Sequence, residues 1–331
     1  MTLKNSSKLF NSLVVRPKQI DKPKIVFMGT PDFARVILEK LFTQDFKIVA
    51  VVAQPDKPKG RGQSMQSPPV ALFAKEKKLH LLQPQRVKDE LFLDEIRALD
   101  PDFVVVAAYG KLLPQTLLDI PKIDCLNVHA SLLPEYRGAA PINQCLLDDK
   151  NVTGVSIMSV QLKLDSGPVY KKSEIPILDE DDAVSLTSKL SELGATALVE
   201  ALPLIQSGEL RAIVQDEGLA THVGKLSREM GKINWQSTAR EIFNKTRALL
   251  PWPVAETSIE GKSLKIYRTK VLAQKSHREP GTIVHIGQEG FTVATVTTDL
   301  LVQEVQLEGK RRMNAFDLAN GLRLKLPLQL G

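Results

Sequence analysis

The chain has 331 residues, a length that suits two domains, and its 43% hydrophobic and 25% charged residues are typical of globular proteins. Charged residues interrupt every apolar run before the roughly 20 residues that a membrane-spanning helix needs, so we expect no membrane partner. With two cysteines and no C-x-x-C or H-E-x-x-H motif, the sequence argues against a disulfide framework and a structural zinc site, and we expect no metal.

The net charge of +6 is spread unevenly along the chain. Residues 1–24 carry a net charge of +5, residues 25–205 a net charge of −4, and residues 206–331 a net charge of +5. Basic ends around an acidic middle indicate a polyanionic partner. The first 20 residues hold four basic groups, three serines and no acid, a composition that organellar transit peptides share with plain bacterial extensions. We treat residues 1–23 as an N-terminal extension and expect a cytoplasmic bacterial protein, or an organellar one if these residues are a transit peptide.

Alternating strands and helices begin at Lys24. The apolar run from Ile25 to Met28 predicts a strand, and Thr30-Pro31-Asp32 predicts the start of a helix. Four further β-branched runs, separated by helical segments, are typical of buried parallel strands: residues 48–53, 103–108, 125–129 and 155–160. With a long helix from about Asp182 to Gln206, they predict a doubly wound, mostly parallel α/β domain over residues 24–207.

A second, smaller domain is predicted over residues 225–331, after a linker over residues 208–224. One helix is expected from Thr238 to Leu250, and the following residues alternate between apolar and polar, as in Leu264-x-Ile266 and Phe291-x-Val293. Turn signals separate these short runs. The pattern indicates a small β-barrel of the OB type.

Asn127 and His129 end the strand predicted over residues 125–129. Because side chains alternate along a strand, these two point to one face, while Leu126 and Val128 pack on the other. Ligands of open α/β sheets bind beyond the carboxyl ends of the strands, where this pair lies. A histidine at a strand end is on its own more often structural, and the asparagine beside it brings the two interpretations into balance.

Asp165 stands in the segment Leu164-Asp165-Ser166-Gly167, which follows the apolar run at residues 155–160. An aspartate before a turn-favouring Ser-Gly pair is typical of an Asx turn, in which the carboxylate accepts a hydrogen bond from its own loop. Spacing alone favours that structural role.

The segment Asn127 to Ile142, NVHASLLPEYRGAAPI, resembles the signature of the folate-dependent formyltransferases, whose N-x-H-x-S-L-L-P core is specific. Similar segments occur along nearly all of the chain after Lys24, at residues 27–33, 108–114, 154–158, 164–167 and 251–253. The resemblance implies transfer of the formyl group of 10-formyltetrahydrofolate to an amine.

The same resemblance implies the catalytic roles. The Asn127 amide is expected to donate to the oxyanion that forms when the amine attacks the formyl carbon. His129 is expected either to donate to the same oxygen or to move the proton that the amine loses, and Asp165 to orient the imidazole and stabilise its charged form. Which of the two tasks His129 performs stays open.

Folate contacts are also implied by the resemblance, at Ser131, Leu132, Leu133 and Pro134 and at the turn Tyr109-Gly110. The sequence departs from the family pattern at two positions of the loop before Asp165. Gln161 stands where family members usually carry an acidic residue, and Lys163 where they usually carry a glycine. Lys163 either reaches the glutamate tail of the folate or points into solvent.

A basic loop, Gln54 to Gln63, follows the second predicted strand and is otherwise an ordinary solvated loop. It is similar to the loop by which the tRNA-specific members of the family contact the acceptor end of tRNA. The similarity implies that Lys57, Lys59 and Arg61 bind phosphates of initiator tRNA carrying methionine, the tRNA of translation initiation. We expect the protein to be a monomer.

Rival functions fit the residues less well. The first turn, Gly29 to Ala34, has one glycine where a nicotinamide dehydrogenase needs G-x-G-x-x-G, and Ser131 lacks the G-x-S-x-G context of a serine hydrolase. A formyltransferase of glycinamide ribonucleotide does not account for the basic loop and second domain. A sugar-nucleotide formyltransferase stays open, whereas the intact Asn127, His129 and Asp165 count against a noncatalytic RNA-binding protein.

Overall fold

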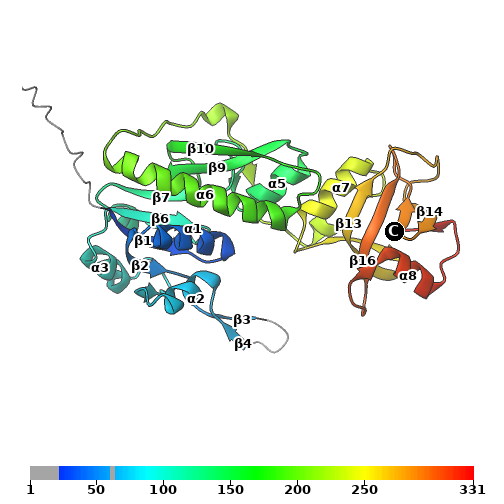
Figure 1. The fold of residues 1–331 in the computed structure, drawn as a ribbon, viewed down its shortest axis with the longest axis horizontal. Helices are drawn as coiled ribbons and strands as arrows, with labels where there is room; N and C mark the ends of the chain where they lie inside the picture. Colours follow the sequence, from blue (N-terminus) through cyan, green and yellow to red (C-terminus); the bar gives the residue numbers. More distant parts are fainter. Residues whose placement is uncertain (1–21, 60–63) are drawn as a thin grey trace, which may run out of the picture.

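A computed structural model describes residues 22–59 and 64–331, so almost all of the extension at residues 1–23, and Arg61 of the basic loop, lie outside the described residues. Two lobes lie side by side along the long axis of the molecule (Figure 1). The first lobe runs from blue to green and the second from yellow to red. No helix within the described ranges is long and apolar enough to cross a membrane.

The first lobe is built on a seven-stranded sheet with the order β10-β9-β7-β6-β1-β2-β5. Five neighbouring strands are parallel: β1 (Lys24–Gly29), β2 (Lys47–Val52), β5 (Leu81–Leu82), β6 (Phe103–Ala107) and β7 (Asp124–His129). Two antiparallel strands complete one edge, β9 (Val152–Ser159) and β10 (Val169–Pro176). The mostly parallel sheet confirms the predicted fold class.

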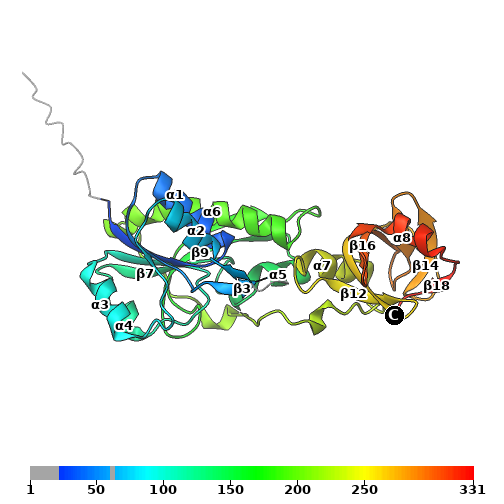
Figure 2. The same ribbon diagram turned by 90° about the horizontal axis from the view of Figure 1, so that it is seen from below.

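Helices cover both faces of this sheet (Figure 2). One face packs against α1 (Asp32–Thr43), α2 (Pro69–Glu76) and α6 (Ala183–Gln206), and the other against α3 (Glu90–Ala98) and α4 (Gln115–Leu118). Side chains of β7 alternate between these two cores: Leu126 and Val128 join the α6 side, and Cys125 joins the α3 side. The sheet is therefore doubly wound.

The prediction that residues 155–160 form a parallel strand was wrong, because β9 runs antiparallel to β7. The helix between the two strands, α5 (Pro141–Leu147), has seven residues and rises about 10 Å. A parallel crossover has to return the chain along the whole of β7, whose six residues span about 20 Å. Because the helix is too short for that return, the chain is still at the carboxyl end of β7 when β9 begins, and β9 therefore runs antiparallel to β7.

A curled antiparallel sheet forms the second lobe, with the order β12-β13-β16-β15-β14-β18 and β17 paired to β16. Its strands are β12 (Ala255–Ile259), β13 (Lys262–Val271), β14 (Thr282–Gly287), β15 (Gly290–Val293), β16 (Leu300–Leu307), β17 (Met313–Asn314) and β18 (Leu328–Gln329). Two helices pack on it, α7 (Ala239–Ala248), which starts at a Thr238–Glu241 capping box, and α8 (Ala315–Leu322). This half-barrel agrees with the predicted barrel-like domain.

Residues 208–224 run from α6 to the second lobe along the first one. They contain a short 3-10 helix, η1 (Glu217–Leu219), and a two-residue strand, β11 (His222–Val223), and a second 3-10 helix, η2 (Glu229–Gly231), follows. Strand β11 pairs in parallel with β8 (Arg137–Gly138), which lies in the segment between β7 and α5. The connection is thus hydrogen-bonded to the loop that follows Asn127 and His129.

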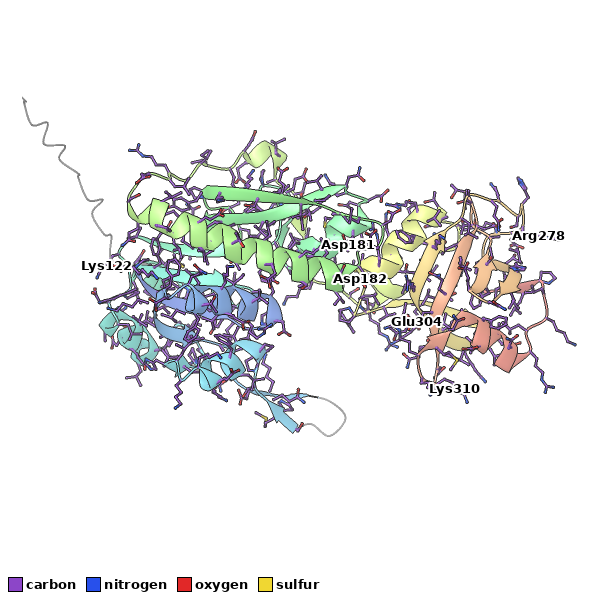
Figure 3. The ribbon with its side chains drawn as sticks, viewed as in Figure 1. Lys122, Asp181, Asp182, Arg278, Glu304 and Lys310 are labelled. Atoms are coloured by element: carbon purple, nitrogen blue, oxygen red, sulfur yellow. The ribbon has the colours of Figure 1, made fainter. Side chains whose placement is uncertain are left out.

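The two lobes meet where α7 approaches α5 and the start of α6. Arg240 donates hydrogen bonds to Asp149 and Asp179, each at 2.7 Å, and the Asn143 amide donates to the Ala248 carbonyl at 2.7 Å. Figure 3 shows Asp181 and Asp182 at the end of α6 that faces the second lobe. The Asp182 side chain caps α6 there by accepting from the Val184 and Ser185 amides.

The packing of α6 on the sheet generates a stability prediction. Leu198 is fully buried on this helix, so Leu198→Ala is expected to lower the free energy of unfolding by about 2–5 kcal/mol through lost burial and a residual cavity. Urea unfolding followed by circular dichroism measures the change. Val184→Ala, at a half-exposed position of the same helix, is the control and is expected to change stability by less than about 0.5 kcal/mol. Equal losses in both variants would contradict this packing.

Candidate active site

A cavity of about 680 Å³ opens at the carboxyl ends of β6 and β7. Its walls come from the turn after β6, the end of β7, the start of α5 and the loop at residues 160–168, which joins β9 to β10. Asn127, His129 and Asp165 all line it. The three residues expected to act together therefore lie around one space, although they come from two separate segments of the chain.

The Asn127 side chain is half-buried in the cavity wall, and its amide has no hydrogen-bond partner among the described residues. A partly buried amide normally finds a partner in the protein or in water. Because both amide hydrogens are free and the side chain borders the cavity, Asn127 can donate a hydrogen bond to an oxygen atom of a bound substrate.

His129 is 6% exposed, and its two ring nitrogens have different surroundings. Nε2 lies 3.0 Å from the carbonyl oxygen of Tyr136, which only accepts, so Nε2 carries a hydrogen and donates it. In the neutral ring Nδ1 then holds the lone pair. Nδ1 lies 3.8 Å from Asp165 Oδ2, a separation within ion-pair range but too long for a direct hydrogen bond. Protonation of Nδ1 would convert this contact into a salt bridge.

The Asp165 carboxylate is fixed from outside its own loop. Its Oδ2 accepts a hydrogen bond of 2.8 Å from the backbone amide of Gly138, in the segment after β7. The Asx turn that spacing alone favours is therefore not what holds this side chain. Instead, a backbone donor from a second segment keeps the carboxylate beside His129, with its side chain largely buried.

Three residues around the cavity have left-handed backbone conformations although none is glycine. They are Ala108, Tyr136 and Asp165, with φ values of 42°, 59° and 48°. Such conformations cost of order 1–3 kcal/mol each and persist only where surrounding contacts hold them. Two of the three take part in the hydrogen bonds of the site: the Tyr136 carbonyl accepts from His129, and the Asp165 carboxylate accepts from Gly138.

The residues expected to bind folate lie in two places. Tyr109 and Gly110 line the cavity, and the Tyr109 carbonyl already accepts hydrogen bonds from Thr30 Oγ1 at 3.0 Å and Gln54 Nε2 at 2.8 Å. Residues Ser131, Leu132, Leu133 and Pro134 do not line the cavity. Ser131 and Leu133 are buried, where the Ser131 carbonyl and the Leu133 amide are both bonded to Ser156 Oγ. That these four residues contact folate stays a prediction.

Strand β3 (Lys57–Lys59) of the basic loop pairs with β4 (Ser64–Gln66), and the two strands project from the first lobe (Figure 1). Lys57 Nζ donates to Gln54 Oε1 at 3.0 Å and remains exposed. At the two positions where the sequence departs from the family, Gln161 lines the cavity, whereas Lys163 forms an ion pair with Glu217. Lys163 therefore does not line the cavity, and its side chain is mostly exposed to solvent beside Glu217.

The sequence did not identify several cavity residues. Those just after β6, Lys111, Leu112 and Leu113, could have been found from the rule that ligands bind beyond the carboxyl ends of parallel strands. Thr187 of α6 and Lys225 of the second lobe also line the cavity. No local sequence signal marks these two, because only the tertiary fold brings them to the site.

The described parts of the chain contain no group of three or more His, Cys, Asp or Glu residues that could bind a metal ion. Close together in the cavity wall lie instead the Asn127 amide, the His129 imidazole and the Asp165 carboxylate. This set can polarise a carbonyl oxygen and accept a proton, which are the tasks of acyl transfer to an amine.

Comparison with protein families matches residues 23–202 to the formyl transferase domain and residues 225–323 to the formyl transferase C-terminal domain. A methionyl-tRNA formyltransferase of Geobacter sulfurreducens is 44% identical over 308 residues, covering 93% of this chain and 96% of the relative. Another, of Acetivibrio thermocellus, is 45% identical over 299 residues, covering 90% and 96%.

Two solved structures have a similar fold at low identity. WlaRD, a sugar 3N-formyl transferase solved with dTDP and 5-N-formyl-THF, has a TM-score of 0.64 and 17% identity and covers 87% of this chain and 99% of its own. HypX from Aquifex aeolicus, in complex with tetrahydrofolic acid, has a TM-score of 0.61 and 14% identity and covers 90% of this chain and 47% of its own. These two similarities concern the fold.

The Tyr109 hydroxyl generates a prediction for this site. It is buried without a partner among the described residues, and burial raises its pKa to about 12. Because an unpaired buried hydroxyl contributes no hydrogen bond, Tyr109→Phe is expected to leave the free energy of unfolding within about 1 kcal/mol and the KM for 10-formyltetrahydrofolate unchanged. Urea unfolding and steady-state kinetics measure both. A clear rise in that KM would show that the hydroxyl binds folate.

Proposed function

The chain belongs to the methionyl-tRNA formyltransferases of the formyl transferase family, and from this premise we propose that the cavity beside β7 is where its reaction takes place. The reaction transfers the formyl group of 10-formyltetrahydrofolate to the amino group of methionine on initiator tRNA, for translation initiation. The observation that carries the assignment of the site is the Asn127 amide, which has no partner in the described part of the chain, beside the His129–Asp165 pair.

Asn127 acts on the formyl oxygen. Attack of the amine on the formyl carbon places negative charge on that oxygen, and the Asn127 amide donates to it. Because the amide has no partner among the described residues, no protein hydrogen bond has to break before it donates to this charge. The amide thus stabilises the transition state more than the uncharged carbonyl of the substrate.

His129 accepts the proton that the amine loses. Nε2 is committed to the Tyr136 carbonyl, so Nδ1 is the ring nitrogen that takes up a proton, and the resulting imidazolium is stabilised by Asp165. The same proton is then available to the folate nitrogen as its bond to the formyl carbon breaks. A free α-amino group titrates near 7.7–8.0, so part of it is neutral near pH 7 and strong base catalysis is not required.

The tRNA occupies the side of the molecule that carries the basic loop. Lys57, Lys59 and Arg61 neutralise phosphates of the acceptor end, and Lys225 adds a positive charge at the cavity wall. Identities of 41–45% to methionyl-tRNA formyltransferases over more than 90% of the chain support this acceptor over a sugar nucleotide. Folate contacts of Ser131 to Pro134, and of the Tyr109-Gly110 turn through its backbone, belong to the same proposal.

The family matches support a catalytic domain over residues 24–207, a linker over 208–224 and a second domain over 225–331. A monomer as the working unit is part of the same proposal. The bacterial relatives support the bacterial cytoplasm as the location. An organelle is the alternative if the basic extension at residues 1–23 acts as a transit peptide.

Asn127→Ala tests the oxyanion role. Loss of one preorganised donor is expected to lower kcat about 100- to 1,000-fold with little change in either KM. Transfer of labelled formyl to initiator methionyl-tRNA measures the rate, with elongator tRNA and a sugar-nucleotide amine as alternative acceptors. Asn151→Ala, at an exposed position, is the matched control and is expected to retain the wild-type rate. Full activity of the Asn127 variant would remove it from the reaction centre.

The double variant Lys57→Ala/Lys59→Ala tests the tRNA contact. Removal of two phosphate-binding charges is expected to raise the KM for tRNA, to leave the KM for folate unchanged, and to reduce the salt dependence of tRNA binding by about one unit of slope per lost contact. Binding assays over a range of salt concentrations measure the slope. A salt slope equal to that of the wild type would show that the basic loop does not touch phosphate.

A further inference from the structure

The connection between the two lobes is hydrogen-bonded at several points to segments of the first lobe that border the site. Val169 and Ile213 exchange backbone hydrogen bonds of 2.8 and 2.9 Å, and further along the chain β11 pairs with β8. The Tyr136 amide donates to Thr221 Oγ1 at 2.8 Å. These contacts hold the connection, residues 208–224, against the first lobe along its length. We call this segment the strap.

Gln215 lies in the middle of this strap, 8% exposed, and uses its amide in four hydrogen bonds. Its Oε1 accepts from Nε and Nη2 of Arg137, at 3.1 and 3.0 Å. Its Nε2 donates to the carbonyls of Asp165 and Gly167, at 2.9 and 2.7 Å. One buried side chain therefore joins the segment after β7 to the loop that carries Asp165.

Arg137 is wholly buried and also donates to Glu217 at 2.8 Å. The hydrogen bonds from Arg137 and then from Lys163 lower the pKa of Glu217 to about 2, so this carboxylate stays ionised over the working pH range. Lys163, which departs from the family pattern, thus adds an ion pair between Glu217 of the strap and the loop that carries Asp165.

The two segments joined by Gln215 are those that orient the reaction centre. Residues on either side of Arg137 supply the Tyr136 carbonyl to His129 and the Gly138 amide to Asp165. Tyr136 and Asp165 are also in the strained left-handed conformation, and the strap bonds directly to the backbone of both. Strained residues keep their conformation only when neighbours hold them.

We propose that Gln215 is a positioning residue for formyl transfer, fixing the distance between His129 and Asp165 through its simultaneous bonds to Arg137 and to the Asp165 loop. It does not line the cavity, so it acts through the two loops and not on the substrate. The inference rests on the roles proposed above for His129 and Asp165. A displacement of about 1 Å at a reaction centre can lower the rate about a hundredfold.

Two substitutions separate positioning from packing. Gln215→Ala removes all four hydrogen bonds. Gln215→Glu keeps the size of the side chain and its acceptance from Arg137, but it places a carboxylate oxygen against the Asp165 and Gly167 carbonyls. A residue that only fills space, or only pairs with Arg137, is rescued by glutamate, whereas a donor that ties the two loops together is not. Val214→Ala, exposed on the same strap, is the matched control.

Steady-state transfer from 10-formyltetrahydrofolate to initiator methionyl-tRNA is measured for the full-length variants, with thermal unfolding to establish that each is folded. Both Gln215 variants are expected to lose about a hundredfold in kcat with KM for each substrate within about twofold of wild type, while Val214→Ala retains full activity. Unchanged kcat, rescue by glutamate, an effect confined to the KM for tRNA, or loss of folded protein in both variants would each overturn the proposal. His129→Ala is measured in parallel: if it retains activity, the proposed reaction centre fails, independently of Gln215.

Discussion

The hydrogen bond from the Gly138 amide to the Asp165 carboxylate is the contact on which the site depends, because it joins the two segments that carry the reaction centre. Its geometry requires glycine. Gly138 has a φ of 122°, and a Cβ atom there would lie 2.1 Å from the Val223 carbonyl oxygen. The residue that presents its amide to Asp165 thus also packs against β11 of the connection, so the geometry of the site depends on the path of the connection.

The reversed direction of β9 explains how a carboxylate from outside β7 reaches His129. Because β9 runs antiparallel, its end lies beside Cys125, where the Val160 amide donates to the Cys125 carbonyl at 2.7 Å. The following loop has to return across the sheet face on which Asn127 lies, and in doing so it forms one wall of the cavity. Gly167 lets this loop close, since a Cβ atom there would lie 1.9 Å from the Ser159 carbonyl oxygen.

The sequence predicted the fold class, the alternating faces of β7 and the family, because apolar periodicity and a long specific motif are local signals. It did not predict the direction of β9, which depends on how far the short α5 can carry the chain. Nor did it assign a role to Gln215 or Lys225, whose places beside the site depend on how residues 208–225 run along the first lobe. Lys163 was recognised as unusual, but its partner, Glu217, is 54 residues away and no spacing rule connects them.

A crystal structure with a stable 10-formyl folate analogue bound would test most directly that the cavity beside β7 is the reaction centre and that Asn127 faces the formyl oxygen. The account predicts this oxygen about 2.7–3.1 Å from Asn127 Nδ2, with the formyl carbon facing His129 and Asp165 across the cavity. A formyl group bound outside this cavity, or turned so that its oxygen faces a donor other than Asn127, would contradict it.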